Sequence, residues 1–227
     1  MTTSRERVLE SVRKALGRRA PLEAAAREAL EARLAAHGRG TIPARGQKSA
    51  RDTVRLFIQM AREAAATVEE IKTLRAVPGA VADFLSTHNL PASVVVAPDP
   101  AIADVAWDTR AMLEIRHGAA EGSDQVSVTG AFAGVAETGT LVLRSGPETP
   151  TTLNFLPDNH IVVLGVDQIV GDYEEVWTLL REAAGSGPVL PRSVNWITGP
   201  SRSADIEQTL LMGAHGPRRL HILLFRG

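Results

Sequence analysis

Three glycine-rich segments in the C-terminal half of the chain carry the side chains best suited to bind or transform a small ligand. Residues 130–140 hold Glu137, residues 198–207 hold Asp205, and His215 stands between glycines in a third segment. Carboxylates and imidazoles are the usual general acids and bases, and neighbouring glycines let a ligand approach the backbone closely. We therefore expect Glu137, Asp205 and His215 to be the catalytic residues of one site.

Other residues of the same segments are expected to bind the ligand through backbone N–H groups and hydroxyls. The spacing after residue 203 predicts a helix over residues 204–212, whose first turn would offer free N–H groups to an anion. Serine suits the cap of such a helix, and a glycine suits its end. The expected ligand-binding residues are Gly130, Thr138, Gly139, Gly199, Ser201, Ser203, Glu207, Gly213 and Gly216.

Each segment also has a purely structural interpretation. Glu137 would then lie in a solvated turn, Asp205 would only stabilise the helix dipole, and His215 would bond a carbonyl group in a turn. The six histidines lack the spacing of a zinc site, so no metal is assigned; a metal held by Glu137, Asp205 and His215 stays open as an alternative. The chain has neither a phosphate-binding glycine fingerprint nor the G-x-S-x-G motif of serine hydrolases, which disfavours nucleotide binding and serine-nucleophile chemistry.

The composition excludes several further classes of site. The 227 residues contain no cysteine, which excludes disulfides, thiolate nucleophiles and cysteine-ligated iron–sulfur clusters, so no cofactor is expected in this chain. No apolar run reaches the roughly 18 residues of a membrane helix, and the N-terminus lacks the apolar core of a signal peptide; we expect a cytoplasmic protein. Residues 1–60 hold 13 Lys/Arg against 6 Asp/Glu, but stacking aromatics are missing, so nucleic-acid binding is not expected.

Hydrophobic periodicity divides the chain into a helical extension, residues 1–47, and a main domain, residues 48–227. In the main domain apolar strand patterns alternate with amphipathic helices. This alternation predicts an α/β fold, an open and mostly parallel sheet flanked by helices. The expected helices cover residues 4–18, 21–36, 51–66, 78–88, 172–184 and 204–212, and the expected strands cover residues 67–71, 93–97, 113–116, 125–129, 140–143, 161–166, 194–198 and 220–225.

Ligands of such sheets bind beyond the carboxyl ends of the strands. The segments after residues 129 and 198 each follow an expected strand, so both are expected at that end of the sheet. His160 immediately precedes the strand expected over residues 161–166. We therefore expect His160 to lie at the opposite end, away from the site.

Four motifs, taken in this order, resemble the LUD domain. They are GAFAGVAETGTLVL (130–143), LPDNHIVVLGVDQIV (156–170), ITGPSRSADIE (197–207) and MGAHGPRRLHILL (212–224). The resemblance covers most of residues 50–227 and is strongest after Gly130. Within the family the chain is similar to the small LutC/YkgG type, which implies a NagB/RpiA/CoA-transferase-like fold.

The resemblance implies a non-redox role in the oxidation of L-lactate to pyruvate. It implies two iron–sulfur partner proteins of the LutA and LutB types, with iron–sulfur clusters only in those partners, and a small hydroxy- or keto-acid as ligand. Glu137 falls in the AETG motif, Asp205 in the second segment and His215 in the HGP motif. Two alternatives stay open: a stand-alone isomerase or transferase acting on a phosphorylated or acyl substrate, and a binding or regulatory module with a vestigial site.

Overall fold

The computed structural model describes residues 3–17, 22–185, 190–206 and 209–226, with the backbone alone for residues 203–206 and 209–212. The chain divides into two compact units, Met1–Thr41 and Ile42–Gly227. The first unit holds the expected helical extension, α1 (Ser4–Ala15) and α2 (Ala24–Ala36), whose described side chains are exposed. None of the described helices combines the length and apolar character that a bilayer span requires.

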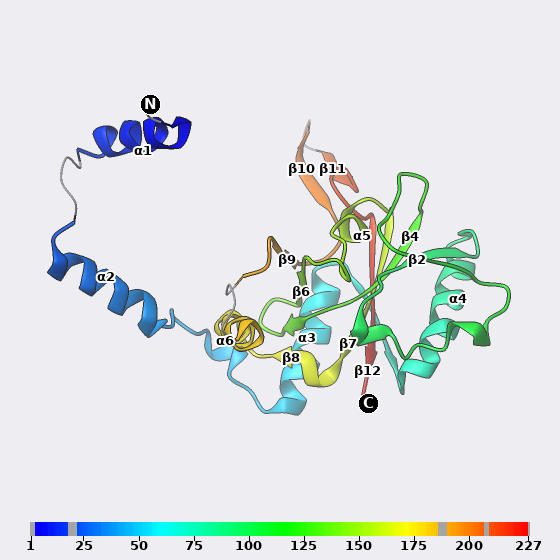
Figure 1. Ribbon diagram of the computed structural model, residues 1–227. Helices are drawn as coiled ribbons and strands as arrows, with labels where there is room; N and C mark the ends of the chain where they lie inside the picture. The colour runs from blue at the N-terminus through cyan, green and yellow to red at the C-terminus, as the bar shows by residue number, and fades with distance from the viewer. Residues whose placement is uncertain (1–2, 18–21, 186–189, 207–208, 227) are drawn as a thin grey trace. The chain divides into compact units, whose positions relative to one another are not determined.

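A parallel sheet of six strands forms the centre of the second unit, in the order β1-β12-β7-β4-β2-β3 (Figure 1). Every neighbouring pair in this sheet is parallel. The predicted fold class, a mostly parallel open sheet flanked by helices, is therefore confirmed. The strands are β1 (Thr67–Ile71), β2 (Ser93–Val96), β3 (Glu114–His117), β4 (Val126–Gly130), β7 (Asn159–Gly165) and β12 (Arg219–Phe225).

The two faces of this sheet are covered differently. One face packs against α4 (Val77–Thr87), whose Val81, Phe84 and Leu85 join a single apolar cluster with β2, β4 and β7. The other face packs against α3 (Ala50–Glu63) and against a second sheet. Central strands therefore carry apolar residues on both faces, which explains why they appear in the sequence as continuous apolar runs.

The second sheet has four strands in the order β8-β5-β6-β9 and mixes parallel and antiparallel pairs. The helix α6 (Tyr173–Ala184) covers its outer face through Val176 and Leu180. The expectation that residues 194–198 join the main sheet is wrong, because β9 pairs with β6 instead. An apolar strand pattern does not specify its pairing partner. The strands are β5 (Ala133–Val135), β6 (Thr140–Arg144), β8 (Ile169–Val170) and β9 (Val194–Ile197).

The helix expected over residues 204–212 is also wrong. This segment forms an antiparallel ribbon of β10 (Arg202–Ile206) and β11 (Thr209–Met212), which extends beyond the end of the main sheet in Figure 1. The ribbon continues at its base, where the N–H of Gly213 donates to the carbonyl of Ser201 at 2.9 Å. A helix this short is only marginally stable by itself. In the ribbon, the backbone of β10 instead forms hydrogen bonds with that of β11, beside the Gly213–Ser201 bond at the base.

Two glycines let the second sheet lie in close contact with α3. Gly139, in the turn between β5 and β6, has φ +65, and a Cβ atom there would lie 2.2 Å from the backbone nitrogen of Ala61. Gly199, two residues after the end of β9, has φ +72, and its Cβ would lie 2.0 Å from the carbonyl oxygen of Ala64, the residue that caps α3. Both turns therefore need a residue that tolerates positive φ and has no side chain.

The substitution Gly139→Ala should lower the free energy of unfolding by about 2–5 kcal/mol. This combines roughly 1–2 kcal/mol for the left-handed backbone with roughly 1–3 kcal/mol for overpacking against α3. Gly185→Ala is the matched control, because Gly185 also has positive φ but has no atom within 4 Å of its Cβ position. Urea denaturation measures both, and equal losses in the two variants would contradict the close contact with α3.

His221, which bonds the edge strand β1 of the main sheet, is expected to make the stability of the fold depend on pH. Its Nδ1 atom lies 2.7 Å from the hydroxyl of Thr67 on β1, and its ring stacks on Phe84 at 4.8 Å between centroids. Burial, with a smaller contribution from the nearby charge of His88, lowers the pKa of His221 to about 4. The imidazole is therefore neutral at pH 7.

Stability should fall as the pH drops from about 6.5 to about 4. Over this window the histidine of the unfolded chain takes up a proton that buried His221 does not, so the unfolded state gains free energy of protonation. His221→Gln should make this dependence shallower, as measured by the free energy of unfolding at a series of pH values. An unchanged slope in the variant would show that His221 does not resist protonation in the fold.

Candidate functional site

A cavity of about 420 Å³ brings the second and third glycine-rich segments together. Gly199, Ser201, His215 and Gly216 all line it, and we call it the His215 cavity. Backbone bonds hold the two segments in place: the N–H of Ser201 donates to the carbonyl of Pro217 at 2.8 Å. The N–H of His215 lies 3.4 Å from the Ser201 hydroxyl, which accepts from it.

His160 lines the same cavity, contrary to the expectation that it lies away from the site. It stands at the amino end of β7, and His215 precedes the amino end of β12, the neighbouring strand. The cavity therefore lies at the amino ends of the main sheet. The segment after β9 reaches this end because β9 belongs to the second sheet and does not run with the parallel strands.

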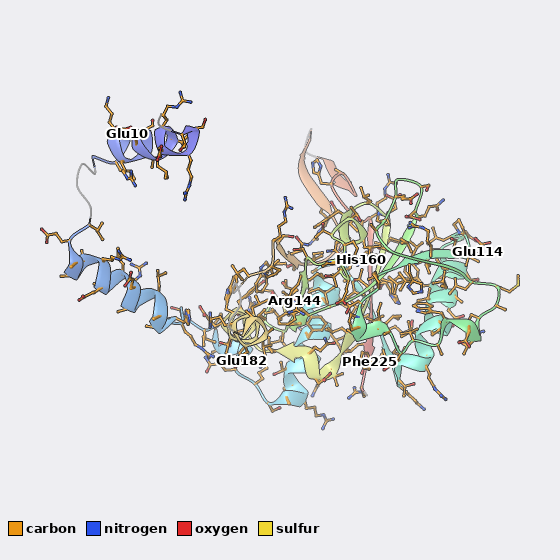
Figure 2. The ribbon with its side chains drawn as sticks, in the orientation of Figure 1. Glu10, Glu114, Arg144, His160, Glu182 and Phe225 are labelled. Carbon is orange, nitrogen blue, oxygen red and sulfur yellow. The ribbon has the colours of Figure 1, made fainter. Side chains whose placement is uncertain are left out.

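The imidazole of His160 is buried and uncharged. Its Nε2 atom lies 2.9 Å from the Thr129 hydroxyl on β4, and burial lowers its pKa to about 3. Its Nδ1 atom is buried, and no described residue forms a hydrogen bond with it. Figure 2 labels His160 inside the body of the main domain. A polar residue opening an otherwise apolar strand was the signal for this position in the sequence.

Asn154 is a further cavity residue, and no sequence pattern pointed to it. It belongs to α5 (Thr152–Phe155), lines the His215 cavity, and is only 3% exposed. No described residue forms a hydrogen bond with its side-chain amide. Because Asn154 lines the cavity, its amide is available to bond a ligand there.

A chain of hydroxyl groups links the first segment to the cavity wall. The hydroxyl of Thr198, which lines the cavity, lies 2.6 Å from that of Thr140 on β6. Thr138 lies 2.7 Å from Thr140, and the Tyr173 hydroxyl lies 2.9 Å from Thr138 and 3.0 Å from Thr140. Thr138 therefore supports the cavity through other residues and is not among those that line it.

Glu137 is not among the residues that line the His215 cavity. It is buried in the turn between β5 and β6, where its backbone N–H donates to the carbonyl of Gly171 at 3.1 Å. Its Oε2 atom has no hydrogen-bond partner among the described residues. The structure thus gives Glu137 a buried carboxylate in a separate position, and the interpretation of Glu137 as a solvated turn residue is wrong.

The remaining predicted residues are spread over several places. Ser203 and Asp205 belong to the backbone of β10, and their side chains lie outside the described part. Glu207 lies outside the described residues altogether. Gly213 follows β11 with φ +79, so it shapes the base of the ribbon and does not end a helix. Gly130 lines a second, smaller cavity.

The His215 cavity has the chemistry of a small-anion site. Arg202 and His215 line it and are exposed, so they supply donors that a carboxylate can reach from solvent. His160 and Asn154 are the buried residues of its lining, and the amide of Asn154 can bond a carbonyl or hydroxyl group. Among the described residues, no group of three or more His, Asp or Glu side chains could hold a metal ion.

Comparisons with known proteins agree with this architecture. The chain is 38% identical to Lactate utilization protein C of Geobacillus thermodenitrificans over 101 residues, 44% of this chain and 42% of that protein. It is 34% identical to Lactate utilization protein C of Bacillus subtilis over 99 residues, 44% of this chain and 41% of that protein. The matched stretch thus spans about two fifths of the length of these curated relatives.

A crystal structure of a DUF162 family protein from Deinococcus radiodurans has a similar fold, with a TM-score of 0.56 and 23% sequence identity. The similarity covers 78% of this chain and 99% of that one. At this level of identity it supports the fold alone. The family model of the LUD domain matches residues 67–225, which include both sheets and every segment that lines the His215 cavity. The chain therefore belongs to the LUD-domain family.

Proposed function

We propose that this protein is a non-redox component of a lactate-utilisation system and binds a small hydroxy- or keto-acid in the His215 cavity. The observation that carries the proposal is its similarity to proteins named Lactate utilization protein C, within a chain that belongs to the LUD-domain family. The chemistry of the cavity supports it, because a small acid needs cationic and hydrogen-bonding donors in one place.

The reaction of the system is the oxidation of L-lactate to pyruvate, which removes two electrons and two protons from the substrate. This chain contains no cysteine to ligate a cluster. We therefore assign the electrons to iron–sulfur clusters of the LutA- and LutB-type partner proteins. The proposed role of this chain is to bind and orient the acid within the complex.

The residues of the cavity have different roles in binding the acid, according to their positions. Arg202 supplies a permanent positive charge for the carboxylate, and exposed His215 supplies a second donor at the same wall. His160 remains neutral at pH 7, so the buried part of the lining adds no charge of its own; the amide of Asn154 bonds the hydroxyl or keto oxygen. Trp196 lines the cavity beside them, so its fluorescence should report an occupant.

Isothermal titration should detect binding of L-lactate or pyruvate to the full chain. Arg202→Gln should weaken this binding about 10- to 100-fold, because a charge-assisted hydrogen bond contributes roughly 1.5–3 kcal/mol. Quenching of Trp196 fluorescence should follow the same titration. Arg62→Gln is the control, since Arg62 is exposed on α3 and lines no part of this cavity. Equal binding by both variants would place the acid elsewhere.

A strain that lacks this protein should fail to grow on L-lactate and should grow normally on pyruvate. The wild-type chain should restore growth, and it should copurify with its iron–sulfur partners. His215→Ala should restore growth poorly while it still copurifies, because the variant loses a ligand contact and keeps the fold. Normal growth of the deletion strain on lactate, together with no copurified partner, would refute the proposed function.

A further inference from the structure

A second cavity, of about 120 Å³, lies at the carboxyl ends of β2 and β4. Part of the main sheet has the strand order β7-β4-β2-β3. From β2 the chain continues to β3 on one side, and from β4 it continues, through strands of the second sheet, to β7 on the other side. The two strands therefore flank the point at which the strand order reverses, and such points are where open α/β sheets bind ligands. We call it the switch-point cavity; Asp99, Thr129, Gly130, Arg144, Thr149 and Asn154 line it.

Asp99 presents a free acceptor to this cavity. Its Oδ1 atom accepts a hydrogen bond from the N–H of Ala101 at 2.9 Å, which fixes the carboxylate. Its Oδ2 atom lies against Gly130, where a Cβ atom would stand only 2.6 Å away. No described residue donates a hydrogen bond to Oδ2. The glycine at position 130 therefore makes room for a carboxylate oxygen that still lacks a donor.

Arg144, which is labelled in Figure 2, presents a positive charge to the same cavity. Its guanidinium carbon stands 4.1 Å from the centroid of the Phe132 ring, a cation–π contact that orients the side chain. Among the described residues, no carboxylate lies within salt-bridge distance of Arg144, Asp99 included. The positive and the negative group of this cavity are thus both available to a ligand.

Asn154 provides the third polar group. It lines the switch-point cavity as well as the His215 cavity, is 3% exposed, and has no hydrogen-bond partner for its amide among the described residues. Thr129 adds a second link, because it lines the switch-point cavity and its hydroxyl bonds His160 of the other cavity. The two cavities therefore adjoin across Asn154 and the Thr129–His160 pair.

We propose that the switch-point cavity is a second binding site, specific for a small 2-hydroxycarboxylate. Arg144 binds the carboxylate, the Oδ2 atom of Asp99 accepts a hydrogen bond from the hydroxyl group, and the amide of Asn154 completes the contacts. A volume of about 120 Å³ is several times the roughly 10–15 Å³ that one water needs, and it suits a small acid better than a nucleotide.

The pair of Arg144 and Asp99 distinguishes a hydroxy acid from its keto acid. The hydroxyl of a 2-hydroxycarboxylate donates to Asp99, whereas the keto oxygen of the oxidised acid can only accept and would set a lone pair against the carboxylate. A site that accepts a hydrogen bond from a substrate hydroxyl disfavours the analogue that lacks this donor. This inference goes beyond the proposed function, in which the acid occupies the His215 cavity.

The test is isothermal titration of the full chain with L-lactate, pyruvate and propionate, in a His215→Ala background that weakens the other cavity. L-Lactate should bind at least about 10-fold more tightly than either competitor, because propionate lacks the hydroxyl and pyruvate lacks its donor. Arg144→Gln should weaken L-lactate about 10-fold or more, and Arg62→Gln should not. Asp99→Asn should narrow or invert the preference for L-lactate over pyruvate, since an asparagine amide can donate to a keto oxygen.

The outcomes separate this inference from the proposed function. Unchanged binding in Arg144→Gln overturns the second site, and so does a preference for L-lactate over pyruvate that is undiminished in Asp99→Asn. The absence of any acid binding in the His215→Ala background overturns it as well. If the deletion strain nevertheless fails on lactate, the proposed function stands without the second site. If the two variants act as expected while the deletion strain grows normally on lactate, the second site stands and the proposed function fails.

Discussion

The contact between α3 and two left-handed glycine turns is the constraint on which the rest of the main domain depends. Gly139 touches the backbone of α3 at Ala61, Gly199 touches that of Ala64, which caps the end of α3, and neither contact leaves room for a Cβ atom. These contacts set the position of the second sheet over the parallel sheet. They also bring the segment after β9 to the amino ends of β7 and β12, where the His215 cavity forms.

The polar groups of the interior form a line between the two cavities. The Thr129–His160 hydrogen bond crosses from β4 to β7, and Asn154 lines the cavity on either side. His160 remains neutral because burial opposes its charged form. An uncharged imidazole bonds a ligand as a donor or as an acceptor, according to its tautomer. The fold thus places adaptable, uncharged groups between the cavities and keeps charged groups, such as Arg202 and Arg144, at exposed positions.

Much of the fold was predictable because a local pattern determines where a strand or helix lies. The continuous apolar run that forms β7 and the amphipathic pattern of α6 each correspond to an element within one or two residues of its expected bounds. For the segment of β10 and β11, the local pattern predicted a helix, and this prediction was wrong. The apolar residues of this segment suit a short helix or a strand equally well, and the hydrogen bond from Gly213 to Ser201 joins the residues that flank its two strands.

The sequence by itself determined the order and type of most elements, the absence of cysteine chemistry, and the glycine-rich segments that shape the loops. Only the tertiary structure decided how those segments group: His215 and Ser201 share a cavity, Gly130 lines another, and Glu137 is buried apart from both. The physical reason is that hydrophobic periodicity acts within an element, whereas the meeting of loops depends on which strands pair. The pairing of β9 with β6 is a long-range choice, and it moved the candidate site to the amino ends of the sheet.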